Sequence, residues 1–165
     1  MKYQRFEQLP VWQAAIDLAV ETYAVTEGPE FRSRHSLRDQ SERAAVSVSN
    51  NIAEGFERGK NPDLLKFLYI ARGSTGEVRS MLCMLERILA FRNLETEIQS
   101  LKQQTESISK QLGAWIQSLL NSEMNGQRYV TDKTRSTDRK KLERDEFLKK
   151  LDRIRKGGEV GSGDA

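Results

Sequence analysis

The chain has 165 residues, of which 37% are hydrophobic and 31% charged, enough for one domain with its own core. No apolar run reaches the roughly 20 residues that span a bilayer, which argues against a membrane protein. The single cysteine excludes an internal disulfide framework, and no apolar run follows residues 1–6 as in an export signal, so we expect a cytoplasmic protein.

The formal net charge of +3 is unevenly distributed along the chain. Residues 1–124 hold 15 Lys/Arg against 16 Asp/Glu, whereas residues 125–165 hold 12 against 8. We therefore expect a folded domain over 1–124 and a flexible basic extension over 125–165, with a short helix at about 138–156. Arg139, Lys140 and Lys141 in this extension are candidate phosphate contacts, although a solvated, disordered tail explains the same composition.

Turn and capping signals divide the domain into helices. The first helix is predicted to begin near Leu9, because Pro10 suits the first helical position, and to end at Gly28-Pro29. Its predicted core positions are Trp12, Ala15, Ile16, Ala19 and Tyr23. The second helix is predicted over Leu37–Arg58, with Ser36 as N-cap and Asp39 completing a capping box.

The remaining helices show longer apolar repeats. Asn61-Pro62-Asp63 predicts the start of a third helix, whose apolar residues recur at spacings of three and four through Leu89, so its end is expected near Arg92. A heptad stripe then predicts a fourth helix, ending before Asn125-Gly126; it comprises Leu94, Ile98, Leu101, Thr105, Ile108, Leu112, Trp115 and Leu119. Short connections between four helices predict an all-α, antiparallel up-down bundle.

Arrangements for catalysis or cofactor binding are missing from the sequence. His35 is the only histidine, and Cys83 has no partner cysteine for a zinc site and lies within an apolar helix, where we expect it buried. Gly73-Ser74-Thr75-Gly76 is not a phosphate-binding loop. We therefore expect no metal, no cofactor and no enzymatic activity.

Two unusual segments are rich in small and polar residues. Residues 43–55 are mostly alanine, serine, asparagine and glycine, which are expected to need tertiary contacts in a helix. Gly73 and Gly76 interrupt the third helix, where each costs about 1 kcal/mol relative to alanine unless another backbone or a subunit comes close. The segments could face each other, and an Asn50 or Asn51 side chain that faced inward would need a partner on a neighbouring helix. A tight polar packing seam without any ligand is the simpler reading.

Charged residues of the two segments are candidates for pairing across that seam. The sequence suggests that Arg43 or Arg72 pairs with Glu54 or Glu77, and that Arg58 pairs with Glu54 one turn away on the same helix.

The residues from Gln40 to Glu77 resemble a known family. The run Arg43-Ala44-Ala45-Val46-Ser47-Val48-Ser49-Asn50-Asn51-Ile52-Ala53-Glu54-Gly55, followed by Arg72-Gly73-Ser74 and Glu77, is similar to the four-helix-bundle proteins encoded in ribosomal-RNA intervening sequences. The resemblance covers about residues 6–120. It implies an antiparallel bundle that assembles into a ring-like homopentamer, with Arg43, Asn50, Asn51, Glu54, Gly55, Gly73, Ser74 and Glu77 as motif residues.

One branch of that family, Avd, implies a specific function. Its members are accessory proteins of diversity-generating retroelements and bind a reverse transcriptase and template RNA. We therefore expect a non-enzymatic scaffold whose partners are itself, a reverse transcriptase and RNA or DNA. The candidate nucleic-acid contacts in the domain are Arg58, Lys60, Lys66, Arg72, Arg79 and Arg87. The alternative is a protein-interaction adaptor of the intervening-sequence type that binds no RNA directly.

Overall fold

The computed structural model describes residues 3–121, 144, 146 and 148. All regular elements in these residues are helical, which confirms the all-α class. The four long helices are α1 Pro10–Thr26, α2 His35–Glu57, α3 Asn61–Leu85 and α4 Glu95–Leu120; three short 3-10 helices are η1 Phe6–Gln8, η2 Pro29–Phe31 and η3 Leu89–Leu94. No helix in this part of the chain is long and apolar enough to cross a membrane.

The predicted basic extension lies almost entirely outside the described residues. This holds for the boundary at 124–125 and for Arg139, Lys140 and Lys141. Within the helix predicted at about 138–156, only Arg144, Glu146 and Leu148 are described, and their backbone is helical.

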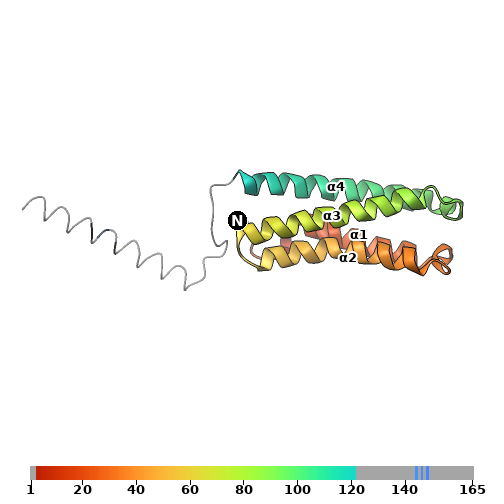
Figure 1. Ribbon diagram of the computed structural model, residues 1–165, viewed down its shortest axis with the longest axis horizontal. Coiled ribbons are helices and arrows are strands. Elements are labelled where there is room, and N and C mark those ends of the chain that lie inside the picture. The colour runs from red at the N-terminus through yellow and green to blue at the C-terminus, as the bar shows by residue number, and fades with distance from the viewer. Residues whose placement is uncertain (1–2, 122–143, 145, 147, 149–165) are drawn as a thin grey trace, which may run out of the picture. The chain divides into compact units, whose positions relative to one another are not determined.

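The long helices lie side by side as a four-helix bundle (Figure 1). Helix α2 packs against α1 and α3, and α4 packs against α3 and α1, so α1 and α3 occupy opposite corners. Figure 1 shows the α1–α2 and α3–α4 connections at one end and the α2–α3 connection at the other. At the shared end, Asn93 donates a hydrogen bond of 2.6 Å to the Glu30 carboxylate, and the Phe31 and Phe91 rings lie 4.8 Å apart. The α1–α2 connection and the α3–α4 connection therefore cover the same end of the core.

The core consists of side chains that recur every three or four residues along each helix. On α4 the buried positions are Ile98, Leu101, Thr105, Ile108, Leu112 and Ile116. The heptad stripe is thus confirmed from Ile98 to Leu112. Its first member, Leu94, is half-buried and lies in η3, and at the other end Ile116 is buried where Trp115 was expected, while Trp115 and Leu119 are only half-buried. A straight α-helix with 3.6 residues per turn drifts away from a strict heptad, which moves the buried position by one residue in the last turns.

Two predicted helix boundaries are wrong. Helix α2 begins at His35, so Ser36 lies inside it and the N-cap, Arg34, makes no side-chain capping bond. Helix α3 ends at Leu85, about two turns earlier than expected, and η3 follows. This change of direction buries Phe91, which is 1% exposed, and leaves Leu89 73% exposed. Packing of Phe91 on Phe31 therefore overrides the apolar periodicity that continues through Leu89.

Candidate functional site

The seam between α2 and α3 brings the two unusual segments together. At Gly55, an added Cβ would lie 2.7 Å from Phe67 Cβ and 3.4 Å from Leu64 Cα, so the helix axes are close at this point. At the middle of α2, the Ser47 hydroxyl forms a hydrogen bond of 2.9 Å with the Ser74 hydroxyl of α3. The structure therefore confirms that the segments face each other and that Gly55 and Ser74 belong to the packing seam.

The asparagines of the motif do not reach a neighbouring helix. The Asn51 amide nitrogen donates to the Ser47 carbonyl oxygen at 2.7 Å and contacts its hydroxyl at 3.0 Å, both one turn earlier on α2. Asn50 is exposed. Neither asparagine therefore needs a partner on a neighbouring helix, because α2 itself satisfies Asn51 and solvent can satisfy Asn50.

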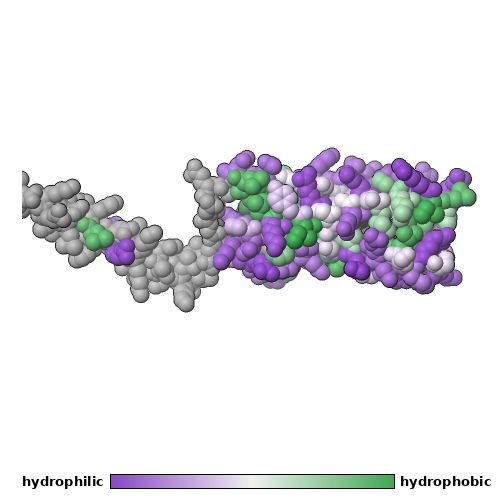
Figure 2. Space-filling model, viewed as in Figure 1, coloured by the Kyte–Doolittle hydropathy of each residue, from purple (hydrophilic) through white to green (hydrophobic). Residues whose placement is uncertain are grey.

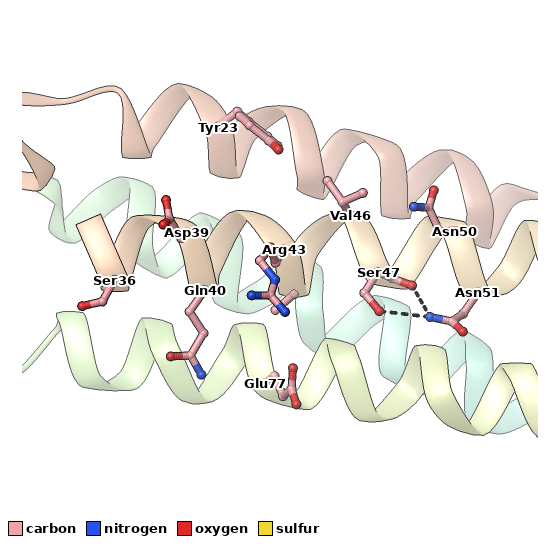
Figure 3. A pocket seen from close by; sticks show the side chains of 11 residues that line it. Tyr23, Ser36, Asp39, Gln40, Arg43, Val46, Ser47, Asn50, Asn51 and Glu77 are labelled. Atoms are coloured by element: carbon pink, nitrogen blue, oxygen red, sulfur yellow. Dashed lines mark hydrogen bonds between the residues drawn. The ribbon is translucent and has the colours of Figure 1, made fainter. Parts of the chain in front are cut away.

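The outward side of α2 forms a groove of about 930 Å³ (Figure 3). Most of its walls come from α2, with Tyr23 contributed by α1 and Glu77 by α3. Amide, hydroxyl and charged side chains dominate the lining, which comprises Ser36, Asp39, Gln40, Arg43, Ala44, Val46, Ser47, Asn50 and Asn51 in addition to those two. Four of the motif residues, Arg43, Asn50, Asn51 and Glu77, thus line a surface groove.

The charges in this groove are not neutralised by one another. Arg43 and Glu77 are both exposed and approach each other in Figure 3, yet they form no ion pair within 4.0 Å among the described residues. Arg72 likewise pairs with neither Glu54 nor Glu77 in the described part of the chain. The predicted cross-seam ion pairs are therefore wrong, and the groove presents opposite charges to whatever enters it.

Sequence reasoning missed one wall of the groove, Tyr23, by assigning it to the core. Tyr23 is 41% exposed, because Thr22 and Thr26 occupy the buried positions of that part of α1. The Thr22 hydroxyl donates to the Leu18 carbonyl at 2.7 Å, and the Thr26 hydroxyl donates to Glu42 at 2.7 Å. The helical spacing of Leu18, Thr22 and Thr26 could have indicated that these residues form the buried face of α1. Threonine occurs at buried and exposed positions alike, however, and its burial cannot be predicted until the partner of its hydroxyl is known.

Gly73 and Gly76 differ from Gly55. Both are exposed, and an added Cβ at either position would meet no atom within 4 Å. The close intrachain backbone contact considered for them is therefore wrong.

The six candidate cations of the domain have different environments. Arg58 pairs with Glu54 at 2.6 Å, as predicted, and lies 4.9 Å from the centre of the Phe67 ring. The hydrogen bond that the Arg58 guanidinium donates to the Glu54 carboxylate raises the pKa of Arg58 above its ordinary value. Arg72 extends toward α4, where its guanidinium would lie 3.8 Å from a Cβ added at Gly113.

The other four cations, Lys60, Lys66, Arg79 and Arg87, are exposed and form no ion pair within the described residues. These four cations are spread along α3, from the residue before its start to two residues beyond its end. Helix α3 has 25 residues. A helix of this length spans about 37 Å, so the cations do not form one compact patch.

Metal ligands are not clustered in the described part of the chain, where no group of three His, Cys, Asp or Glu side chains could hold an ion. His35 is exposed, and Cys83 is half-buried rather than buried as expected.

Comparisons with known proteins identify the family. No curated protein matches the chain. The family model described as 23S rRNA-intervening sequence protein matches residues 7–114, which include all four helices except the last turns of α4. The matched region contains the α2–α3 seam and the groove. The chain therefore belongs to the 23S rRNA-intervening sequence protein family.

Proposed function

We propose that this protein is a cytoplasmic, non-enzymatic scaffold that docks a protein partner in the groove on α2. The observation that carries the proposal is the position of the motif residues. Arg43, Asn50 and Glu77 belong to the family motif, yet they line an exposed groove and form no hydrogen bond or ion pair across the α2–α3 seam among the described residues. Exposed polar residues of this kind are better explained by binding than by packing.

The chemistry of the groove suits a polypeptide. Gln40 and Asn50 offer exposed amides that can both donate and accept hydrogen bonds, and Tyr23 adds an aromatic surface with a polar end. Arg43 and Glu77 provide one charge of each sign. A nucleic-acid backbone would be repelled by Glu77 and Asp39, whereas a protein surface can match charges of both signs.

The finer part of the proposal follows the family resemblance. We infer an antiparallel bundle that self-associates into a ring of five copies and serves a diversity-generating retroelement by holding its reverse transcriptase. The alternation of the connections between the two ends of the bundle supports antiparallel helix directions. A ring would repeat the groove on every copy and convert modest single-site binding into avidity.

The groove is tested by comparing two substitutions of the same kind. Asn50→Arg places a bulky cation in the groove, whereas Gln103→Arg places it on the exposed side of α4. Tagged full-length proteins are purified from cells of the source after nuclease treatment, and co-purifying proteins are identified by mass spectrometry. We expect a reverse transcriptase or another RNA-processing enzyme with the wild type and with Gln103→Arg, but not with Asn50→Arg. Equal recovery with both variants would contradict docking in the groove.

RNA binding is a second candidate function, supported by a different observation. Lys60, Lys66, Arg79 and Arg87 remain exposed without an acidic partner among the described residues, although the domain contains more acidic than basic residues. Unpaired surface cations are available for phosphate contacts, because binding releases counterions without breaking an existing ion pair. Arg58 is less available, since Glu54 and Phe67 already engage it.

A further inference from the structure

Two faces of the bundle carry exposed apolar side chains. On α1, Val20 is 63% exposed. On α3, Tyr69, Ile70 and Met84 are 49%, 42% and 39% exposed. Figure 2, which shows the side of the bundle where α3 lies between α2 and α4, shows hydrophobic side chains interrupting a largely hydrophilic surface. Large exposed apolar side chains grouped on a helix face mark candidate contact surfaces.

The charges flanking these two faces have opposite signs. Helix α1 contains two acidic side chains, Asp17 and Glu21, and no basic one. On this side of α3, Lys66, Arg72 and Arg79 outnumber the two acids, Asp63 and Glu77, and Glu77 also lines the groove. By helical spacing, Arg72 is one turn from Tyr69 and Lys66 is one turn from Ile70. The α1 face is therefore apolar with an acidic border, and the α3 face is apolar with a basic border.

The shapes of the faces also differ in a complementary way. Gly73 and Gly76 lie between the exposed apolar residues of α3 and leave space above the helix backbone, since an added Cβ at either meets nothing within 4 Å. On α1 the branched side chain of Val20 protrudes. A protruding side chain on one face can thus approach the backbone of the other closely.

The faces cannot meet within one molecule, because α1 and α3 occupy opposite corners of the bundle. From this we infer that the α1 face of one copy docks on the α3 face of a second copy, in a head-to-tail contact. The inference rests on the self-association in the proposed function and assigns its surfaces. A contact between two different faces repeats from copy to copy and closes into a ring when the rotation at each contact permits.

The contact is tested with one substitution on each face. Gly73→Leu fills the space above α3, and Val20→Lys replaces the protruding apolar side chain of α1 with a cation that the basic α3 border repels. Both positions are exposed in the single copy, so the fold is expected to survive, which far-ultraviolet circular dichroism checks. Gln103→Leu on the exposed side of α4 is the matched control for Gly73→Leu. Sedimentation velocity of the full-length proteins measures the assembly.

We expect Gln103→Leu to assemble like the wild type. We expect the assembly of each face variant to dissociate at a protein concentration at least about tenfold higher than that of the wild type, which is the size of effect that an overpacked contact produces. An equimolar mixture of the two variants is the decisive sample. The Val20→Lys copy keeps an intact α3 face and the Gly73→Leu copy keeps an intact α1 face, so the mixture should form heterodimers and no larger species.

Three results would overturn the assignment, and they are distinguishable from a failure of the proposed function. If the wild type assembles but the face variants assemble equally well, or if their mixture gives no heterodimer, the surfaces are wrong while self-association stands. If the wild type is itself a monomer at micromolar concentration, self-association and this contact both fail. Docking of a partner in the groove is unaffected by any of these results.

Discussion

At the scale of single residues, glycines in similar sequence contexts have opposite structural roles. Gly55 and Gly73 both lie inside long helices and both belong to the family motif. The backbone of α3 and the Phe67 side chain leave no room for a side chain at Gly55, whereas Gly73 has open space around it. The first glycine therefore serves the packing of the single copy, and the second does not.

Alanine substitutions should separate these roles by the sign of their effect on stability. Gly55→Ala should lower the free energy of unfolding by about 1–2 kcal/mol, because the overpacking cost exceeds the gain in helix propensity. Gly73→Ala should raise it by roughly 0.5–1 kcal/mol, since only the propensity changes. Urea unfolding followed by circular dichroism measures both. A stabilised Gly55→Ala protein would contradict the close approach of α2 and α3.

At the scale of elements, the α3–α4 connection decides where α3 ends. Phe91 is buried against Phe31, and the Arg34 guanidinium lies 5.3 Å from the centre of its ring. Asn93 adds its hydrogen bond to Glu30 on the α1–α2 connection. Because the Phe91 ring and the Asn93 amide contact Phe31 and Glu30 of the α1–α2 connection, η3 holds the two connections together at this end of the bundle.

Truncation of two neighbouring apolar residues in η3 should have very different consequences. Phe91→Ala should cost about 3–5 kcal/mol, because it empties a buried aromatic site that joins the two connections. Leu89→Ala should change the stability by less than about 0.5 kcal/mol, since Leu89 is 73% exposed. Thermal and urea unfolding of both variants test this. Similar effects of the two substitutions would mean that η3 does not anchor this end.

At the scale of the whole molecule, the charge is divided between opposite sides. Helix α1 is acidic, whereas exposed cations follow α3 from Lys66 to Arg87 just beyond its end. A phosphate backbone is therefore expected to approach the α3 side and avoid the α1 side. The basic residues between 125 and 165 are further candidates for phosphate contacts.

RNA binding should respond to salt and to the loss of the unpaired cations. Filter binding of a structured RNA to the full chain should weaken steeply with salt, and the double substitution Lys60→Gln with Lys66→Gln should reduce the magnitude of the slope of log K against log salt by about 1–2. Lys102→Gln is the control, because the Lys102 ammonium already pairs with Glu86 at 2.8 Å. Affinity that does not change with salt would exclude electrostatic RNA binding.

Much of this architecture was predictable from local sequence patterns. Pro10 and Gly28-Pro29 mark α1, the break at Gly59 separates α2 from α3, and the repeat from Ile98 to Leu112 marks the core face of α4. These features depend on backbone geometry and on apolar residues recurring once per turn, which act within a few residues of the chain. The family motif could likewise be recognised from its letters alone.

Only the tertiary structure decided which motif residues face the solvent. The sequence by itself determined four helices with apolar stripes and showed that residues 43–55 and 72–77 are unusual. It did not reveal that Ser47 meets Ser74 while Arg43, Asn50 and Glu77 line a groove, or that Tyr23 is a groove wall. The reason is physical: helix formation depends on neighbours along the chain, whereas burial depends on the rotation and spacing of helices that pack from distant positions.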